Sequence, residues 1–423
     1  MDARPYYTFG ITLLITLISV SGIALPYPIL APLFLDLGHP VGQFLGLPPK
    51  LLLGVALAIY PVGILIGGNY IGAWSDRAGR KRVLAWTMLG AALSYGLTAW
   101  SISLGSFSLF ALSRLLTGLF EGNLSVARAI AADLHPRIDR TRAFSYLSAM
   151  GYAGYLVGPL VGGMLLPLGA SLAFWVAALA CAAALGLILV ALPADSPKGT
   201  KEGQGSSLSL LTQPKYRSFF ACYLLLMLGL NGFYEFYPVW LVEYLAFDSQ
   251  QIAWATVLLT SAMIATATLA TMKVKRLLGL VPSALVGMVL FALAIASFPY
   301  GSGQYIASFV AAGAGIALFN AMVPSYLSEQ AQGSDGQGQL MGLLTTVFCL
   351  GNVIIAILGA LLALFDTRLV LMLSALLSVM AALQFHRLSR HGLTAPKQSA
   401  ETSSPGSGGA SVPTEVLRSG DDH

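Results

Sequence analysis

The sequence predicts an all-α membrane protein with twelve transmembrane helices in two pseudo-symmetric six-helix bundles. Three observations support this prediction: a very apolar composition, twelve apolar stretches long enough to cross a bilayer, and an internal repeat. Of the 423 residues, 56% are hydrophobic and only 10% are charged, and the mean hydropathy is +0.76. This composition is far too apolar for a soluble globular protein.

The apolar stretches determine the expected helices. A hydrocarbon core about 30 Å thick requires roughly 20 apolar residues in each crossing helix. The first stretch is too long for the core of a signal peptide and has no cleavage site, so we expect it to be the first transmembrane helix. The twelve expected spans lie near residues 8–35, 51–74, 83–103, 107–132, 143–167, 169–194, 217–244, 250–272, 281–300, 303–326, 339–364 and 367–386.

The distribution of basic residues gives the expected orientation. The net charge is +5 and the pI is about 9.0, but all except four of the 23 lysines and arginines fall in the termini or in loops on one side. The exceptions are Lys50 and Arg368 on the other side, and Arg114 and Arg128 within spans. This positive-inside pattern predicts a multi-pass protein of the plasma (inner) membrane with both termini in the cytoplasm. The basic pI therefore gives no reason to expect a nucleic-acid partner.

The two halves of the chain resemble each other. An offset of 210 residues aligns Tyr27-Pro28 with Tyr237-Pro238, and an offset of 197 aligns Asn123 with Asn320. Two such bundles form the architecture in which a site at the repeat interface opens alternately to each side of the membrane. We expect an N-terminal bundle over residues 1–195, a flexible cytoplasmic linker over 196–215, a C-terminal bundle over 216–390 and a disordered cytoplasmic tail over 391–423.

Three short motifs carry the most specific signal. The loop between the second and third spans reads Gly72-x-x-x-Asp76-Arg77-x-Gly79-Arg80-Lys81-Arg82, and Gly79 can supply a positive φ at a tight turn. The fourth span contains Arg114-x-x-x-Gly118, and the fifth contains Gly154-x-x-x-Gly158-Pro159-x-x-Gly162-Gly163. Together they resemble the signature loop, the intramembrane arginine motif and the antiporter motif of the major facilitator superfamily, and in particular its twelve-helix drug–proton antiporter branch.

The resemblance implies a conformational latch at the charged loop. Asp76 is expected near the N-terminus of helix 11, around residues 336–340, where free N–H groups and the helix dipole favour an anion. Arg80 is expected to pair with Asp133 at the cytoplasmic end of helix 4. The remaining members of this latch are Gly72, Arg77 and Gly79.

The motif in the fifth span is expected to act through close helix packing. Glycines four residues apart make a flat strip on a helix, and a proline within it perturbs the backbone hydrogen bonds. The resemblance places this helix at the contact between the two halves. The residues concerned are Gly154, Gly158, Pro159, Gly162 and Gly163.

Four charged residues lie well inside the spans: Arg114, Glu121, Arg128 and Glu235. Ionisable side chains are costly inside a membrane and are functional candidates for that reason. The first three are spaced by seven residues, so on a continuous helix they would share one face with about 10 Å between neighbours. The alternative is that they form internal ion pairs that hold the bundle together. None of the four recurs at the aligned position of the other half, which favours a functional role.

The resemblance places helices 1, 4, 7 and 10 around a central cavity. Glu235 has no cation near it in the sequence and is the first candidate for proton coupling, while Glu121 lies between two arginines and is the second. Arg114 is expected to orient substrate or to relay the protonation state, and Arg128 is also expected at the cavity. Further candidate polar wall residues are Ser21, Tyr27, Asn123, Asn231, Tyr234 and Asn320.

The sequence therefore predicts a proton-coupled secondary active transporter, rather than an enzyme, that exports small amphipathic compounds by proton antiport with alternating access. The alternative is a proton symporter that imports a small anionic metabolite, because two arginines on a cavity helix suit a carboxylate or phosphate. A receptor or a structural membrane protein is the third interpretation. We expect a monomer whose partners are the lipid bilayer, protons and a small-molecule substrate.

The cysteines and histidines predict no disulfide framework, metal site or cofactor. Cys181, Cys222 and Cys349 all fall inside spans, where they are best explained as small apolar packing residues. The five histidines lie in loops, at the end of the last span or in the tail. No nucleophile–base pair stands out either, which disfavours a membrane-embedded enzyme.

Overall fold

The computed structural model describes residues 4–36, 38–134, 137–138, 140–193, 214–298, 304–330 and 337–391. Within these residues the chain is helical, with short connecting turns and no strand. Of the expected linker and tail, residues 196–213 and 392–423 lie outside the described part of the chain. The all-helical membrane fold predicted from the sequence is confirmed.

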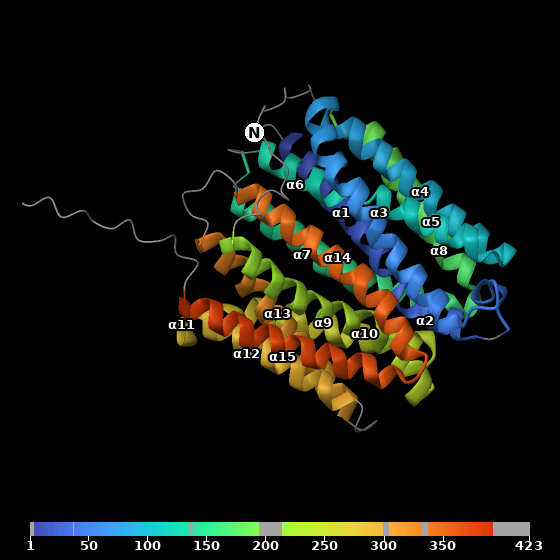
Figure 1. Cartoon of the computed structure of the whole chain (residues 1–423). Helices are drawn as coiled ribbons and strands as arrows, with labels where there is room; N and C mark the ends of the chain where they lie inside the picture. The colour runs from blue at the N-terminus through green and yellow to red at the C-terminus, as the bar shows by residue number, and fades with distance from the viewer. Residues whose placement is uncertain are drawn as a thin grey trace, which may run out of the picture.

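The helices divide into two groups that follow the chain (Figure 1). The first group comprises α1 (Arg4–Ala24), α2 (Tyr27–Leu35), α3 (Pro49–Ala78), α4 (Arg80–Leu104), α5 (Phe107–Leu119), α6 (Asn123–Asp133), α7 (Arg140–Leu165) and α8 (Ala170–Ala191). The second comprises α9 (Pro214–Leu245), α10 (Ser249–Ala265), α11 (Thr271–Leu278), α12 (Leu280–Ser297), α13 (Tyr305–Gln330), α14 (Gln337–Ala363) and α15 (Thr367–His391). Short 3-10 turns occupy Pro40–Gly42 and Leu166–Leu168, and a π-helical segment at Thr266–Ala270 joins α10 to α11.

Eleven helical segments of the described chain are long and apolar enough to cross a membrane. The remaining expected span, the fourth at residues 107–132, is divided into α5 and α6 by a break at residues 120–122. The expectation of one continuous helix there is therefore wrong. The first span is also bent between α1 and α2, where Pro26 interrupts the helix.

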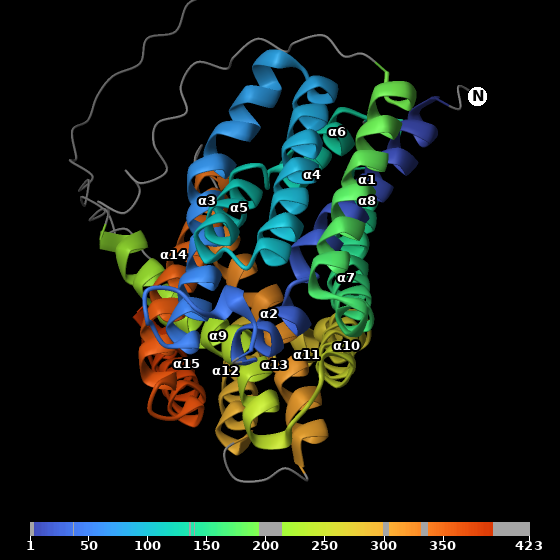
Figure 2. The ribbon, with the colours of Figure 1, turned by 90° about the vertical axis from the view of Figure 1, so that its right-hand side faces the viewer.

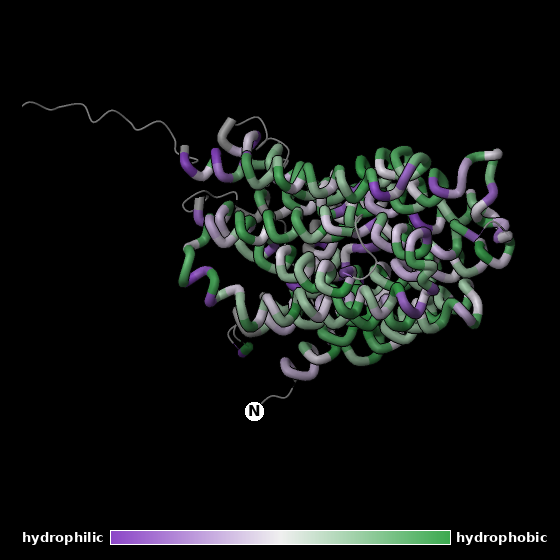
Figure 3. The backbone as a smooth tube through the Cα atoms, turned by 90° about the horizontal axis from the view of Figure 1, so that it is seen from below, coloured by the Kyte–Doolittle hydropathy of each residue, from purple (hydrophilic) through white to green (hydrophobic). Residues whose placement is uncertain are grey.

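The outer surface is that of a membrane protein. Apolar positions predominate along the helices (Figure 3), and large apolar side chains such as Leu93, Leu179 and Val190 are exposed. Proteins surrounded by water rarely expose so much apolar surface, so we expect lipid to cover it. The exposed tryptophans lie within about two turns of helix ends, the usual depth of membrane interfaces; they are Trp74, Trp86, Trp100, Trp175 and Trp254.

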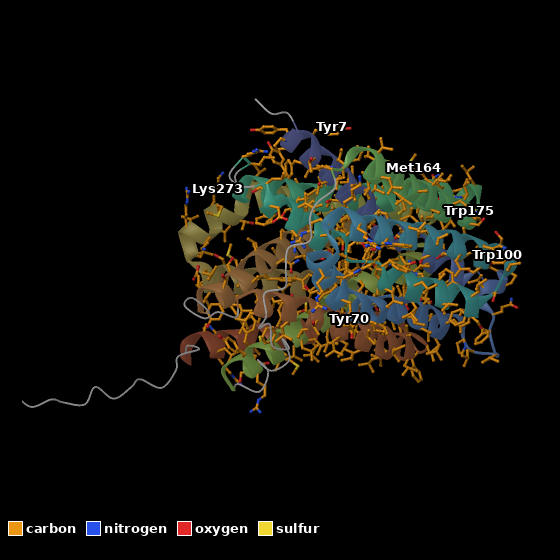
Figure 4. The ribbon with its side chains drawn as sticks, turned by 90° about the horizontal axis from the view of Figure 1, so that it is seen from above. Tyr7, Tyr70, Trp100, Met164, Trp175 and Lys273 are labelled. Atoms are coloured by element: carbon orange, nitrogen blue, oxygen red, sulfur yellow. The ribbon has the colours of Figure 1, made fainter. Side chains whose placement is uncertain are left out.

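The connecting turns lie at two opposite ends of the helical bundle. We call the end that carries the turns near residues 36–48, 105–106, 165–169, 246–248 and 364–366 the distal end. The opposite end, where α3 meets α4 at Gly79 and where α8 ends, is the proximal end. Figure 4 shows Trp100 and Trp175 toward the distal end and Lys273 at the proximal end. The sequence predicts that the proximal end faces the cytoplasm.

Each group of helices has its own apolar core. One cluster of buried side chains runs from Tyr216 to Phe385 and belongs wholly to the second group. The other runs from Ile11 to Leu192 and also takes in a few side chains of the second group, namely Phe236, Val239, Ala360, Ala363 and Val370. Figure 2 shows the two groups one above the other from a second direction. The shared side chains show where the groups are packed together, near the distal ends of α9 and α14 and the start of α15.

Two helix pairs make the most extensive contacts between the groups. α3 packs along α14, where a β-carbon on Gly54 would overlap Ala356 and Ala360. α7 packs along α10, where Ser249 Oγ donates a hydrogen bond of 2.9 Å to the carbonyl of Gly163. Gly54 and Ser249 lie near the starts of α3 and α10, and Gly163 lies near the end of α7. Both of these contacts are therefore at the distal end.

A cluster of polar groups closes the same end. Lys50 Nζ, at the start of α3, lies 2.6 Å from Glu243 Oε1 of α9 and donates a hydrogen bond of 2.6 Å to the carbonyl of Ala363, the last residue of α14. Thr367 Oγ1, at the start of α15, donates to Glu243 Oε2 at 2.6 Å. We call these four residues the distal clasp. It ties one residue of the first group to three residues of the second.

Candidate functional site

A cavity of about 140 Å³ lies between the two groups of helices. Its wall brings together residues that are far apart in the sequence. From the first group come Ile23, Pro26, Tyr27, Leu30, Leu57, Tyr60, Pro61, Ile64, Arg114, Glu121 and Tyr155. From the second come Glu235, Phe348, Cys349 and Asn352. The family resemblance implied that helices 4 and 7 line a common cavity, and both contribute charged residues to this wall. Helix 10 (α13), also expected there, contributes none of these lining residues.

The two predicted carboxyls differ in their surroundings. Glu235, in the middle of α9, is 5% exposed, and neither carboxyl oxygen has a hydrogen-bond partner among the described residues. Glu121 lies at the break between α5 and α6, and its Oε1 accepts a hydrogen bond of 2.9 Å from Ser19 Oγ. A buried polar group without a partner carries a large desolvation penalty. Glu235 is therefore the group that gains most from a proton or a cationic ligand.

Arg114 is the cation of the cavity. Its side chain is buried, and its guanidinium carbon lies 4.6 Å from the centre of the Tyr60 ring. This distance is within the range of a cation–π interaction. Nε and Nη1 of Arg114 have no hydrogen-bond partner among the described residues. Two nitrogens of the guanidinium are thus available to an anionic or hydrogen-bond-accepting group in the cavity.

Arg128 lies outside the central cavity. It is exposed on α6 and does not line the cavity. The expectation that Arg114, Glu121 and Arg128 share one helical face is wrong, because the helix breaks at residues 120–122.

Close packing around glycines accompanies the break in helix 4. Gly118 lies against the backbone of α3 at Tyr60 and Gly63, and Gly122 lies against the side chain of Ile71. Glycine also has a low helix propensity, so two glycines within one turn weaken the helix. Irregular backbone at membrane depth is tolerated where it is buried in protein or lines a cavity. The break places Glu121 at the cavity wall.

A chain of hydrogen bonds fixes the break. Thr87 Oγ1 donates to Asn123 Oδ1, and Asn123 Nδ2 donates to Ser19 Oγ at 3.1 Å. The hydroxyl of Ser19 in turn donates to Glu121. Asn123, 2% exposed, therefore acts as an internal hydrogen-bonding residue rather than as part of the cavity wall.

The other predicted polar residues lie in different places. Tyr27 lines the cavity, and its ring centre is 6.3 Å from that of Tyr234, which lines a smaller pocket beside Glu235. Asn231 is buried and donates a hydrogen bond of 3.1 Å to the carbonyl of Phe348. Ser21 and Asn320 are not among the cavity-lining residues; Asn320 is exposed on α13.

Several wall residues were not singled out from the sequence. Asn352 Oδ1 is buried without a partner among the described residues, and Tyr60, Tyr155 and Cys349 also line the cavity. Asn352 is the single amide in an apolar run of helix 11, and this signal could have identified it. The tyrosines gave no such signal, because tyrosine is common in membrane helices.

The structure describes part of the latch expected at the proximal end. Arg80 Nε lies 3.5 Å from Asp133 Oδ2, and Arg80 Nη1 donates a hydrogen bond of 2.7 Å to Ser75 Oγ. Gly79 has a φ of +92°, which supports the expected tight turn. The ion pair joins α4 to α6 within the first group, so it does not itself connect the two groups.

The rest of the latch is only partly described. Gly72 and Asp76 lie in α3, but the expected contact of Asp76 with residues 336–340 involves side chains outside the described part of the chain. Arg77 is exposed. The role of these residues as a latch therefore stays a prediction.

The glycine motif of α7 has two packing faces. β-Carbons on Gly154, Gly158 and Gly162 would overlap α1 and the bend that follows it, within the first group. Only Gly163 faces the second group, at Ser249 and Ala253 of α10. Pro159 lies inside the helix between these glycines. Most of the motif thus serves the first bundle itself, and one residue serves the contact between the groups.

The described residues hold no group of three or more His, Cys, Asp or Glu side chains placed to bind a metal ion. The three cysteines are free and buried. The functional groups at the cavity are two carboxyls, one guanidinium, an amide, a thiol and tyrosine hydroxyls.

Comparison with known proteins gives a family. The sequence profile of the Major Facilitator Superfamily matches residues 12–248 and 219–419. Tetracycline resistance protein class H of Pasteurella multocida is 32% identical over 172 residues, which cover 40% of each chain. Quinolone resistance protein NorA of Staphylococcus aureus is 25% identical over 242 residues, 55% of this chain and 58% of NorA. The chain matches about two fifths of the length of the tetracycline resistance protein.

Solved structures show the same fold. The human organic anion transporter MFSD10 has a TM-score of 0.65 at 19% identity over 90% of this chain and 99% of its own. An inward-facing, occupied structure of a bacterial homologue of the human lysosomal transporter Spinster has a TM-score of 0.74 at 12% identity over 94% of this chain and 100% of its own. Because the profile covers most of the sequence, this multi-pass membrane protein belongs to the Major Facilitator Superfamily and resembles its drug–proton antiporter branch.

Proposed function

We propose that the protein is a monomeric, proton-coupled transporter that exports small amphipathic compounds by proton antiport. It would act in the plasma membrane with both termini in the cytoplasm and expose its cavity alternately to each side. One observation carries the proposal: Glu235 is buried at the cavity wall with both carboxyl oxygens unpartnered among the described residues. The names of the relatives, which include tetracycline and quinolone resistance proteins, support export of drug-like compounds.

Competition between a proton and the substrate for Glu235 would couple proton movement to substrate transport. A neutral Glu235 removes the cost of a buried charge, whereas a cationic group on a substrate would stabilise the ionised form. Proton and substrate would then exclude each other at one carboxyl, which is the requirement for antiport. Tyr27 and Tyr234, close to this carboxyl, offer aromatic faces for the apolar part of the substrate.

Glu121 would have a different role. Its carboxyl already accepts a hydrogen bond from Ser19, whose hydroxyl is oriented by Asn123. A hydrogen bond donated to a carboxylate stabilises the charged form. Glu121 would therefore give up its proton more readily than Glu235, which has no such donor, and Glu235 would be the first candidate for proton exchange.

A second candidate function is proton-coupled import of a small anionic metabolite. Arg114 supports it, because two guanidinium nitrogens at the cavity lack a partner among the described residues. The human Major facilitator superfamily domain-containing protein 10 also supports it, being 36% identical over 126 residues, 30% of this chain and 26% of that protein. A solved structure of MFSD10 is titled an organic anion transporter. The direction of proton movement distinguishes the two functions.

The experiment is collapse of a pH gradient in inside-out vesicles that contain wild type or Glu235→Gln. The compounds tested are lipophilic cations and small organic anions. For the proposed antiport, at least one cation releases protons with wild type and not with Glu235→Gln. Glu329→Gln is the matched control, because Glu329 is an exposed carboxyl that pairs with Lys275 at 3.5 Å and does not line the cavity.

Two results would overturn the proposal. Equal release of protons by wild type and Glu235→Gln would remove Glu235 from the coupling mechanism. Proton movement in the same direction as an anion, with no response to any cation, would favour the symporter instead.

A further inference from the structure

A groove of about 520 Å³ runs along the outer surface at the proximal end, between α4 and α8. Ala78, the last residue of α3, also lines it. It shares no lining residue with the central cavity. Its remaining lining residues are Lys81, Arg82, Ala85, Trp86, Leu89, Leu185 and Leu189.

The charged lining of this groove is entirely basic. Lys81 Nζ donates hydrogen bonds of 2.9 and 2.6 Å to the carbonyls of Leu189 and Leu192, so its ammonium is held at the end of α8. Arg82 is exposed, and none of the described contacts uses its guanidinium. No acidic residue lines the groove. The proximal rim thus presents one fixed cation and one free guanidinium.

The apolar lining continues from this rim along both helices. On α4, Ala85 and Leu89 follow Arg82 by one and two turns, which is about 10 Å of helix. On α8, Leu185 and Leu189 form the facing wall. Trp86 also lines the groove, within two turns of the start of α4, and indole rings are enriched at the membrane interface. A ligand that fits has an anionic head and an apolar chain.

We propose that this groove binds one acidic phospholipid of the proximal leaflet. The phosphate would lie against Arg82 and Lys81, and one acyl chain would follow Ala85 and Leu89. A zwitterionic lipid carries its own cation in the headgroup, which the two basic side chains would repel. Lysine and arginine near a membrane surface each strengthen binding of anionic lipid about fivefold. The site is separate from transport, so it does not depend on the direction of proton coupling.

Quenching of Trp86 fluorescence by brominated lipid tests the site directly. The full-length protein is placed in phosphatidylcholine vesicles with a small fraction of brominated phosphatidylglycerol or brominated phosphatidylcholine. Subtracting the signal of Trp86→Phe isolates the contribution of Trp86. We expect the phosphatidylglycerol to quench Trp86 with at least fivefold higher apparent affinity than the phosphatidylcholine.

Three variants determine whether the groove is responsible. Arg82→Gln is expected to lower the preference for phosphatidylglycerol about fivefold, whereas Arg276→Gln, which removes an exposed cation from α11 at the same end, leaves it unchanged. Ala85→Phe fills the groove and is expected to weaken quenching by both lipids. Equal quenching of wild type by the two lipids, an unchanged preference in Arg82→Gln, or undiminished quenching in Ala85→Phe would each overturn the proposal.

Discussion

At the scale of single residues, some polar groups at the cavity have hydrogen-bond partners and others have none among the described residues. Glu121 has its hydrogen-bond donor in Ser19, while Glu235, Arg114 and Asn352 have buried atoms without partners among the described residues. Buried polar atoms in folded proteins nearly always have a partner. Among the described residues, four that have such atoms line this cavity, where ligands, protons or water can supply the partners; they are Tyr60, Arg114, Glu235 and Asn352.

The hydrogen-bond chain at the break of helix 4 gives a first prediction. Asn123→Ala would remove the two hydrogen bonds that Asn123 makes with Thr87 and Ser19, each of which contributes about 0.5–1.5 kcal/mol. We expect the melting temperature of the purified protein to fall by several degrees. Asn320→Ala, at the aligned position of the second half, is the control because Asn320 is exposed. Equal loss of stability in both variants would contradict a special role for these hydrogen bonds.

The ring beneath Arg114 gives a second prediction. The interaction of a desolvated guanidinium with a tyrosine is worth up to about 2 kcal/mol. Tyr60→Leu removes the aromatic face and is expected to lower transport several-fold in the vesicle assay. Tyr60→Phe keeps the face and loses only a hydroxyl that has no described hydrogen-bond partner, so it is expected to retain transport. Similar activity of the two variants would rule out a role for the aromatic face.

At the scale of helices, the sequence predicted which spans exist better than where they bend. Charged residues inside apolar runs are conspicuous, so Arg114, Glu121 and Glu235 could be identified as functional candidates, and the family resemblance implied their place at a cavity. The break at residues 120–122 was missed because the apolar stretch over residues 107–132 was interpreted as one continuous helix, whereas the packing of Gly118 and Gly122 is a tertiary contact. The periodicity of apolar residues predicts secondary structure and does not predict contacts between helices.

The distal clasp was also invisible in the sequence. Lys50 and Glu243 are 193 residues apart, and Lys50 appeared only as a basic residue on the unexpected side. In the structure its ammonium is paired with Glu243 and also lies at the C-terminal end of α14, where the helix dipole favours a cation. Pairing of this kind depends on the arrangement of four helices, which only the fold specifies.

The clasp gives a third prediction. Lys50→Met removes the one residue that the first group contributes to it. A partly exposed ion pair is worth about 1 kcal/mol, which changes a two-state equilibrium about fivefold. We expect a membrane-impermeant maleimide added at the distal side to label Cys349, which lines the cavity, about five times faster. The experiment uses intact cells in a Cys181→Ser, Cys222→Ser background.

The control for the clasp is a second ion pair at the same end. Arg368 Nη2 lies 2.7 Å from Asp366 Oδ2, only two residues away, so this pair cannot hold the two groups together. The hydrogen bonds from Arg368 keep the pKa of Asp366 below its usual value. Arg368→Gln is expected to leave labelling of Cys349 unchanged. An increase equal to that in Lys50→Met would mean that any charge change at this end opens the cavity.

At the scale of the whole molecule, a repeated fold carries a site that is not repeated. Arg114 and Glu121 come from the first group of helices, and Glu235 and Asn352 come from the second. Between the groups the contacts described at α3–α14, at α7–α10 and in the clasp all lie at the distal end. Separating the groups at that end would open the cavity to the distal side without disturbing either apolar core.

The glycines of α7 allow this idea to be tested separately from bundle stability. Gly163→Val places methyl groups against Ser249 and Ala253 of the second group, whereas Gly158→Val places them against α1 within the first. We expect Gly163→Val to speed distal labelling of Cys349 with little change in melting temperature, because each core stays intact. We expect Gly158→Val to lower the melting temperature without favouring distal labelling, because it forces apart helices of one bundle. The reverse assignment of the two effects would show that α7 joins the groups through Gly158 instead.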